Sequence, residues 1–307
     1  MLPFDKLRIN YSSARVCWAV KIGVLFMKAQ SFSFEFFPPK TDKGIENLAK
    51  VRDEFATLKP AFFSVTYGAG GSTQDSTINT VITTQKESGI PTASHLSCVG
   101  SSAEQIHDIL TMYKENGINR LVALRGDLPS GMRNIGDFQY ANDLIAFIRK
   151  ETGDHFQIEA AAYPEMHPQA KNYQTDIENF VRKMEAGADR AITQYFYNLD
   201  AYFHFVDSVA NAGVDKPVVP GIMPITNFVQ LARFSDGTGA EIPRWLRKRL
   251  EGYGDDLDSI QKLGNEFVTE MCEKLLAGGA PGLHFYSMNR VEPSKTIWND
   301  LGLSSRV

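Results

Sequence analysis

The chain has 307 residues, of which 43% are hydrophobic and 22% charged, and its formal net charge at pH 7 is −4. This composition is typical of a soluble globular protein, and the slightly acidic balance argues against nucleic acid as a partner. Cys17, Cys98 and Cys272 are far apart and form no CxxC pair, so neither a disulfide framework nor a structural zinc site is expected. The cysteine pattern fits a reducing cytoplasm.

Residues 1–29 are predicted to be an N-terminal extension, either disordered or a misassigned start. The apolar stretch 16–27 is interrupted by Lys21 and is shorter than the roughly 20 residues that a membrane-spanning helix needs. Met27-Lys28 resembles an ordinary protein start, and residues 29–31 form a poor signal-cleavage site. We therefore expect no membrane association, with an ordered arm and a targeting segment as the alternatives.

From residue 31 onward, a short β-rich run, a polar turn and a helical pattern alternate. The predicted strands are 32–36, 62–66, 92–97, 121–124, 157–162, 190–195, 217–222 and 283–287. The predicted helices are 42–58, 74–88, 102–116, 140–151, 175–186, 199–212, 227–234 and 256–277. Ser102 and Gln105 have the spacing of a capping box, and 237–253 is predicted to be an insert.

Eight alternating units indicate an α/β protein whose parallel strands close into a (β/α)8 TIM barrel, a single domain over residues 30–307. The glycine-rich run 67–71 fits neither GxGxxG nor GxxxxGK[ST], which argues against an open nucleotide-binding sheet. By itself, this run is equally consistent with a flexible loop that needs positive φ angles.

Polar or ionisable side chains follow nearly every predicted strand at its carboxyl end, where TIM barrels hold their active sites. Each alone could be structural, but the joint pattern indicates an enzyme. These residues are Glu35, Thr66, Tyr67, His95, Arg125, Asp127, Tyr163, Glu165, His167, Gln194, Asn289 and Arg290.

Glu35 is a lone carboxylate in a run with four phenylalanines, residues 32–39. Burial among apolar groups raises the pKa of a carboxyl group, because the charged form loses solvation. A raised pKa would make Glu35 a general acid near neutral pH. The alternative is an outward-facing glutamate on an alternating strand.

Arg125-Gly126-Asp127 follows an apolar strand and places a cation and an anion at its exit. Arg125 would suit a phosphate or could pair with Asp127. Asp127 could be a nucleophile, a metal ligand or an electrostatic stabiliser. A metal is not favoured, because His95 and His167 lack local ligand partners and neither HxH nor HExxH occurs.

The predicted helix 175–186 carries Asp176, Asn179 and Lys183, which are three or four residues apart and share one helix face. Together with the strand end before it, this face is either a solvated surface or a polar groove for ribose and phosphate.

Eight segments at the strand ends form an ordered set of motifs: FSFEFFPPK (32–40), SVTYGAGGS (64–72), HLSC (95–98), ALRGDLP (123–129), AAYPEMHPQAK (161–171), RAITQYFY (190–197), PGIMPITNF (220–228) and HFYSMNR (284–290). In order and spacing they resemble methylenetetrahydrofolate reductase of the bacterial type, over roughly residues 30–303. The resemblance is to the short form that has the catalytic barrel only.

The resemblance implies a cytoplasmic flavoprotein of one-carbon metabolism. It would use bound FAD and NADH to reduce 5,10-methylenetetrahydrofolate to 5-methyltetrahydrofolate, which feeds methionine biosynthesis. The scheme would be ping-pong, with NADH and folate using the same site in turn. Bacterial relatives are homo-oligomers, so a homo-oligomer is expected.

The resemblance also assigns roles. Glu35 matches the general acid that assists opening of the folate's five-membered ring, and Asp127 matches the carboxylate that stabilises the resulting cation. The residues that match the FAD groove are Thr66, Tyr67, Ala69, His95, Arg125, Gly126, Asp127, Tyr140, Ala141, Tyr163, His167, Ala170, Asp176, Asn179, Arg182 and Lys183. The residues that match substrate contacts are Thr66, Gln194, Gln230, Phe234 and Arg290, with Thr66 and Gln194 also on the nicotinamide side.

Phe234 matches an aromatic that stacks on NADH or folate, although periodicity alone favours a buried helix residue. Three other classes of protein remain as alternatives: a flavin-dependent barrel of the proline dehydrogenase kind, a lyase or aldolase, and a non-catalytic folate-binding protein. An aldolase often uses a Schiff-base lysine on a strand, and no predicted strand core carries a lysine.

Overall fold

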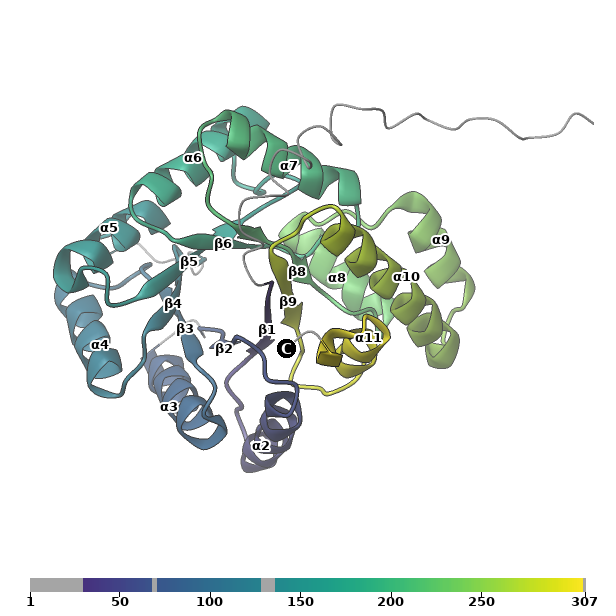
Figure 1. Ribbon diagram of the computed structural model, residues 1–307, viewed down its shortest axis with the longest axis horizontal. Coiled ribbons are helices and arrows are strands. Elements are labelled where there is room, and N and C mark those ends of the chain that lie inside the picture. The colour runs from purple at the N-terminus through teal and green to yellow at the C-terminus, as the bar shows by residue number, and fades with distance from the viewer. Residues whose placement is uncertain (1–29, 68–70, 128–135, 306–307) are drawn as a thin grey trace, which may run out of the picture. The chain divides into compact units, whose positions relative to one another are not determined.

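Short parallel strands alternate with helices around a ring in the computed structural model, which describes residues 30–67, 71–127 and 136–305 (Figure 1). The described residues from Ser31 onward form one compact unit. The predicted extension, residues 1–29, and Ala69 lie outside the described residues. The strands are β1 (Ser31–Phe36), β2 (Phe62–Val65), β3 (Thr92–Ser97), β4 (Arg120–Leu124), β5 (Gln157–Ala162), β6 (Arg190–Thr193), β7 (Val218–Val219), β8 (Gly221–Ile222) and β9 (Gly282–Tyr286).

The ring closes through a strand that is split in two. β7 and β8 are the two halves of the predicted strand 217–222, interrupted at Pro220, which has no N–H to donate to a neighbour. β6 pairs with β7, β8 pairs with β9, and the Pro220 carbonyl accepts a hydrogen bond from the His284 N–H at 3.0 Å. All pairs are parallel, in the order β7-β6-β5-β4-β3-β2-β1-β9-β8, which confirms the TIM barrel.

The helices surround the strand ring (Figure 1). They are α2 (Asp42–Ala56), α3 (Gly71–Ser88), α4 (Ala103–Glu115), α5 (Ala141–Thr152), α6 (Tyr173–Glu185), α7 (Leu199–Asn211), α8 (Phe228–Thr238), α9 (Arg244–Gly252), α10 (Leu257–Ala277) and α11 (Ser294–Asp300), followed by the 3-10 turn η1 (Leu303–Ser305). The capping box of Ser102 and Gln105 is present at α4. The predicted insert 237–253 contains the end of α8 and all of α9, and α11 was not predicted.

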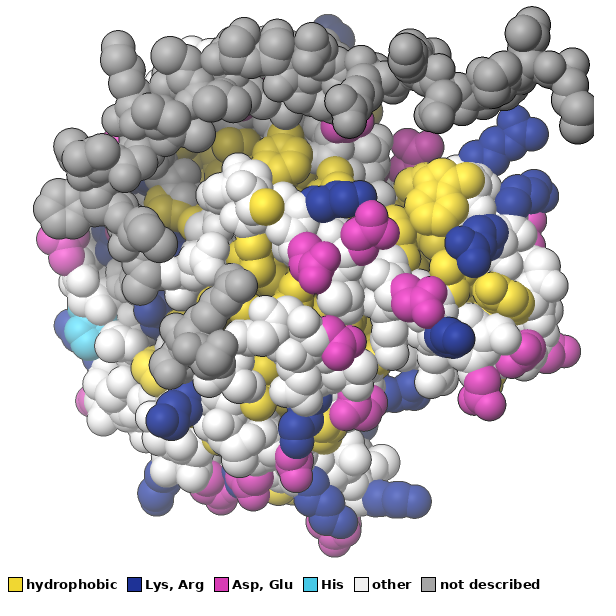
Figure 2. Space-filling view, turned by 45° about the vertical axis from the view of Figure 1, so that its right-hand side comes forward, with side chains coloured by type: hydrophobic (Ala, Val, Ile, Leu, Met, Phe, Trp, Pro, Cys, Tyr) yellow, Lys and Arg dark blue, Asp and Glu magenta, His cyan; other side chains and the backbone are white. Residues whose placement is uncertain are grey.

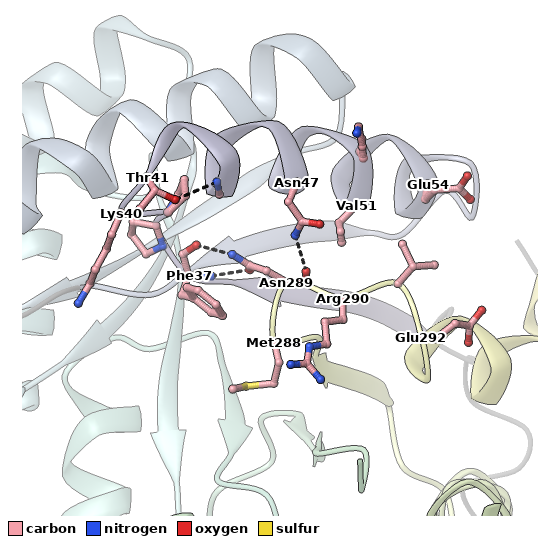
Figure 3. A pocket seen from close by; sticks show the side chains of 15 residues that line it. Phe37, Lys40, Thr41, Asn47, Val51, Glu54, Met288, Asn289, Arg290 and Glu292 are labelled. Atoms are coloured by element: carbon pink, nitrogen blue, oxygen red, sulfur yellow. Dashed lines mark hydrogen bonds between the residues drawn. The ribbon is translucent and has the colours of Figure 1, made fainter. Parts of the chain in front are cut away.

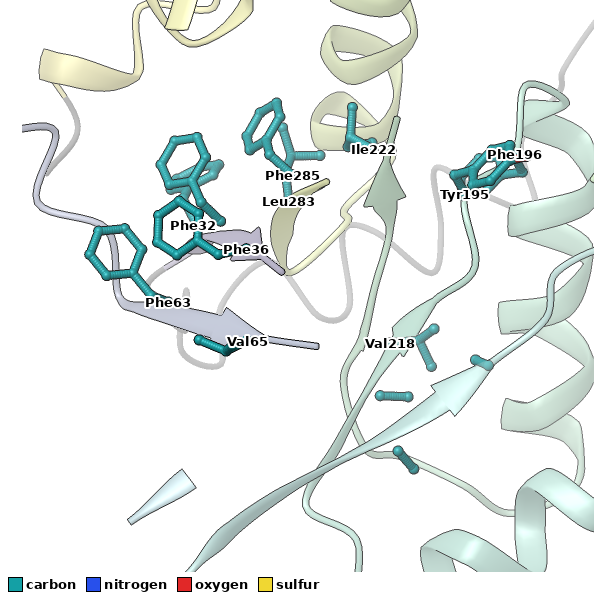
Figure 4. Close-up of a cluster of buried hydrophobic side chains, with 14 of the residues drawn as sticks. Phe32, Phe36, Phe63, Val65, Tyr195, Phe196, Val218, Ile222, Leu283 and Phe285 are labelled. Atoms are coloured by element: carbon teal, nitrogen blue, oxygen red, sulfur yellow. The ribbon is translucent and has the colours of Figure 1, made fainter. Parts of the chain in front are cut away.

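The hydrophobic core lies between the strand ring and the helices, and β1 shows why. Side chains alternate across a strand, so Phe32, Phe34 and Phe36 all point to the helix side. Phe34 stacks on Phe55 of α2 at 4.0 Å between ring centroids and also contacts Trp298 of α11. Figure 4 shows part of this layer. The same alternation turns Ser33 and Glu35 into the barrel.

The outer surface carries no continuous basic area on the face seen in Figure 2, where acidic and basic side chains of the described residues are intermixed. This arrangement agrees with the acidic balance of the sequence. No helix in the described part of the chain is long and apolar enough to cross a membrane.

The seam between β1 and β9 depends on Gly282. Its φ is +145°, and a Cβ atom there would lie 1.8 Å from the Ser31 carbonyl oxygen. We expect Gly282→Ala to lower the free energy of unfolding by about 3 kcal/mol, because the backbone of β1 would have to shift. Urea unfolding measures this change.

The matched control is Gly279→Ala. Gly279 also has a positive φ, +91°, but a Cβ atom there would have no neighbour within 4 Å. It should cost only the strain of the left-handed backbone, about 1 kcal/mol. Equal losses for the two variants would show that contact with Ser31 does not matter.

Candidate active site at the carboxyl ends of the strands

Glu35 faces two imidazoles and a hydroxyl inside the barrel. Its Oε2 atom lies 3.0 Å from His95 Nε2, 3.4 Å from His284 Nε2 and 3.4 Å from Ser64 Oγ. The register accounts for these neighbours, since Glu35 is paired with Ser64 on β2, and Ser33 with His284 on β9. The Glu35 side chain is 14% exposed, so it remains accessible from the rim.

His284 is held in one orientation by Ser33. It is fully buried, and its Nδ1 atom lies 2.7 Å from Ser33 Oγ while Nε2 faces Glu35. The sequence interpretation assigned neither residue a role. The available signal was the alternation of β9, which puts His284 on the same face as Tyr286, together with a polar side chain two residues before Glu35.

The predicted environment of Glu35 was wrong, because the phenylalanines lie on the opposite face of β1. Burial raises the pKa of the Glu35 carboxyl, but the charge of His95 and the hydrogen bond from His284 outweigh it and lower the pKa from its ordinary 4.5 to about 2. The resting group is therefore a carboxylate.

The Arg125-Gly126-Asp127 turn follows β4 and is tied to β3. The Arg125 carbonyl accepts hydrogen bonds from Ser97 Oγ and the Val99 N–H, both at 2.9 Å. Gly126 has φ +87°, and a Cβ atom there would lie 2.0 Å from Ser97 Oγ, so only glycine fits. The Arg125 guanidinium donates to Gln169 rather than pairing with Asp127, and Asp127 is exposed.

Tyrosines connect the Glu35 and Asp127 sides of the rim. Burial raises the pKa of Tyr286, and the Glu35 carboxylate and Tyr163 raise it further. Burial likewise raises the pKa of Tyr163, with the Asp127 carboxylate as the next cause, and Tyr163 shares a hydrogen bond with Gln194. Tyr163 therefore lies within electrostatic reach of both the Asp127 carboxylate and Tyr286, which is itself influenced by Glu35.

The β5–α6 loop is tied to α6 and β5 by polar contacts of α6 side chains. Asp176 Oδ2 accepts from the His167 N–H at 2.8 Å, and the Lys183 ammonium donates to the Ala161 carbonyl at 2.5 Å. Burial lowers the pKa of Lys183 to about 8. Ala170 closes the loop by donating its N–H to the His167 carbonyl.

The remaining residues predicted for the cofactor lie at the ends of neighbouring elements. Thr66 and Tyr67 directly follow β2, and both are partly buried. Tyr140 and Ala141 are at the start of α5, where Asp143 caps the Tyr140 N–H at 2.9 Å. Asn179 and Arg182 are exposed on α6 and are hydrogen-bonded to each other.

The predicted substrate residues other than Thr66 come from three segments. Gln194 follows β6 and accepts from the Tyr195 N–H through its side chain at 3.0 Å. Gln230 is exposed in the first turn of α8. Phe234 on the same helix is 46% exposed, so the prediction from periodicity that Phe234 is buried was wrong. Arg290 is exposed after β9.

Two chemistries find no support in the described residues. No group of three or more histidine, cysteine, aspartate or glutamate side chains there could hold a metal ion. The nine described strands contain no lysine that could form a Schiff base. The fold and site thus define a TIM-barrel protein with a carboxylate–imidazole cluster inside the barrel and polar side chains after several of its strands.

Comparisons with known proteins specify the family. Residues 23–302 match the family model for methylenetetrahydrofolate reductase. The chain is 40% identical over 271 residues to the 5,10-methylenetetrahydrofolate reductase of Escherichia coli K12, covering 88% of this chain and 90% of that protein. It is 39% identical over 286 residues to methylenetetrahydrofolate reductase (NADH) 1 of Arabidopsis thaliana, with 89% of this chain and 48% of that protein covered.

Among solved structures, a Clostridium thermocellum protein described as binding two copies of 5-methyl-5,6,7,8-tetrahydrofolic acid shares the fold. The TM-score is 0.64 at 18% identity, with 93% of this chain and 97% of that chain covered. The chain belongs to the methylenetetrahydrofolate reductase family, a family of oxidoreductases.

Glu165 provides a pH-dependent test of the loop beside this site. Its Oε2 atom accepts from the Glu241 N–H at 2.8 Å, and burial raises the pKa of its carboxyl from 4.5 to about 7. The folded chain therefore keeps this proton as pH rises from about 4.5 to 7 while the unfolded chain loses it, so the group costs stability above pH 7. We expect Glu165→Gln to remove this cost.

Thermal unfolding at pH 5 and pH 8 measures the effect. Relative to the parent, Glu165→Gln should gain about 1 to 2 kcal/mol more at pH 8 than at pH 5, a value reduced for partial solvent access. Glu46→Gln, at an exposed position of α2, should show no such pH dependence. A gain that is independent of pH would contradict the assignment.

Proposed function

We propose that the protein reduces 5,10-methylenetetrahydrofolate to 5-methyltetrahydrofolate with NADH and bound FAD, in a ping-pong reaction that supplies methionine biosynthesis. The observation that carries the proposal is the Glu35 carboxylate between His95 and His284 at the rim of a barrel of this family. We expect the protein to act in the cytoplasm as a homo-oligomer.

The donor set suits FAD. Arg125, Lys183 and Arg182 bring positive charge to the loop and helix that would hold the diphosphate, and Asp176 and Asn179 offer partners for ribose hydroxyls. Thr66, Tyr67, His95 and Gly126 lie at the strand ends nearest to Glu35 and Asp127, where the flavin ring would lie. FAD would supply the capacity to take a hydride from NADH and pass it to the folate.

Glu35 would deliver the proton that opens the five-membered ring of the folate. Because the histidines keep Glu35 ionised at rest, the proton would be carried by His95 or His284 and reach the substrate nitrogen through the Glu35 carboxyl group. The carbon–nitrogen bond breaks, the nitrogen keeps the proton, and an iminium cation remains on the substrate. Ser33 would keep His284 aimed at Glu35 throughout.

Asp127 would stabilise this cation. A carboxylate at the mouth of the site lowers the energy of positive charge that forms nearby, and it acts most strongly where water is excluded. Tyr163, which is influenced by the Asp127 carboxylate and hydrogen-bonded to Gln194, would help to fix the position of the substrate. Hydride then reaches the iminium carbon and neutralises the charge.

A shared site for NADH and folate needs a surface that accepts two different rings. The exposed Phe234 ring on α8 provides such a surface, and Gln194 offers an adaptable amide. A proline dehydrogenase-like barrel would share the FAD groove but would not need Glu35 together with Gln194 and Arg290. A non-catalytic folate-binding protein would not need Glu35 at all.

Glu35→Gln tests the acid role. The amide cannot donate the proton for ring opening, so folate reduction should fall by a factor of at least about 100. Oxidation of NADH with an artificial electron acceptor should continue, because that half-reaction needs no proton from Glu35. Steady-state assays of both half-reactions measure the difference. Folate turnover at the parental rate would refute the assignment, and Glu46→Gln serves as the control.

Asp127→Asn tests the cation-stabilising role. We expect the rate of folate reduction to fall about 10- to 100-fold and the rate of flavin reduction by NADH to fall much less, because the cation forms only in the folate half. Rapid-mixing absorbance at flavin wavelengths follows each half separately. Equal losses in the two halves would count against this role, and Asp108→Asn, on the exposed face of α4, should leave both rates unchanged.

A further inference from the structure

The split strand interrupts the backbone ladder beside the end of β6. The pairing of β6 with β7 ends at Ile192, and Pro220 then separates β7 from β8. The polar groups at this interruption find side-chain partners. Thr193 Oγ1 accepts from the Gly221 N–H at 2.9 Å, and the Thr193 carbonyl accepts from the Tyr286 hydroxyl at 2.6 Å. Tyr286 of β9 therefore completes the hydrogen bonding of β6 from the other side of the split strand.

Gly221 makes room for the Tyr286 ring. A Cβ atom on Gly221 would lie 2.6 Å from Tyr286 Cε2 and 2.7 Å from the Tyr286 hydroxyl oxygen. Alternation along β9 turns Tyr286 into the barrel together with His284, and the two rings meet edge-on at 5.4 Å between centroids. The ring is therefore confined between β8 and His284, which directs its hydroxyl to the Thr193 carbonyl.

The strand that carries Tyr286 is fixed to the strand that carries Glu35. The two residues are register partners in the pairing of β9 with β1. Directly after β9, the Ser287 hydroxyl donates to the Glu35 carbonyl at 2.5 Å. The Asn289 side chain accepts from the Phe37 N–H at 3.0 Å and donates to the Phe37 carbonyl at 2.9 Å, as Figure 3 shows. The position of Tyr286 is therefore tied to that of Glu35.

Tyr286 also fixes the peptide group from which the Gln194 side chain starts. Gln194 directly follows Thr193, and its N–H donates to the Ala162 carbonyl of β5 at 2.7 Å. The peptide group between these two residues is therefore held at both polar atoms, by Ala162 at its N–H and by Tyr286 at its carbonyl. From this fixed peptide, the Gln194 side chain reaches Tyr163.

We propose that Tyr286 is a positioning residue that sets the distance between the Glu35 carboxylate and the Gln194 amide. The inference rests on the proposed function, in which Glu35 serves ring opening and Gln194 serves both folate and NADH. Without the Tyr286 hydroxyl, the Thr193 carbonyl would lose its partner and the peptide would be free to turn. Gln194 would then meet both substrates less well, while Glu35 and its histidines would stay in place.

The test is Tyr286→Phe, which removes the hydroxyl and keeps the ring beside His284. We expect the KM values for methylenetetrahydrofolate and for NADH each to rise about tenfold, as for the loss of one well-placed hydrogen bond, while kcat falls less than about threefold. Calorimetry with 5-methyltetrahydrofolate should show a similar loss of affinity in the absence of turnover.

Tyr202→Phe is the matched control. The hydroxyl of Tyr202, which is buried on α7, donates to the Val218 carbonyl of the same split strand at 2.8 Å, but from the helix side of the ring. Both variants should lower the melting temperature, and Tyr202→Phe should leave both KM values unchanged. A Tyr286→Phe variant that loses thermal stability and keeps its KM values would overturn the proposal, because its role would then be structural.

A double-mutant cycle identifies the residue through which Tyr286 acts. Gln194→Ala removes the amide, so adding Tyr286→Phe to it should change neither KM by more than about twofold. Losses that multiply in the double variant would overturn the proposal and leave the proposed function intact. A parent that does not reduce methylenetetrahydrofolate would overturn the proposed function itself, and this inference with it.

Discussion

The site depends on the Glu35 carboxylate, which lies inside the barrel and whose negative charge is stabilised there by two histidines. Isolated buried carboxylates are costly, and Glu35 is tolerated because His95 of β3 and His284 of β9 approach the same oxygen. This compensation needs the ring to be closed, since His284 comes from β9, the last strand. The charge of Glu35 therefore depends on the same strand pairing that closes the barrel.

A second carboxylate in the same barrel shows that burial alone does not decide the outcome. Glu159 of β5 is 1% exposed, and burial raises its pKa despite Arg190 and Arg120 nearby. Its nearest cation contact is 3.5 Å, to Arg120, compared with 3.0 Å from Glu35 to His95. Direct contacts from two imidazoles thus outweigh burial and lower the pKa of Glu35.

The rim combines fixed and adaptable parts. The loops after β1 and β9 are joined through Asn289, and the turn after β4 is held against β3 by Ser97, so the reacting groups have little freedom. Phe234 and Arg290 lie exposed at the edges of the same rim. The proposed reaction, in which two different molecules use one site, would need both: rigid groups for proton transfer and charge stabilisation, and a surface that accepts different rings.

The sequence by itself determined the order of strands and helices, the barrel, and the residues at the strand ends, because these follow from periodicity and from local motifs. It did not determine the surroundings of Glu35. Its neighbours in the chain are phenylalanines, but alternation sends those to the helix side, and the groups it contacts come from residues 64, 95 and 284. Only tertiary structure could decide its charge state, because strand register and ring closure bring those distant side chains to one oxygen atom.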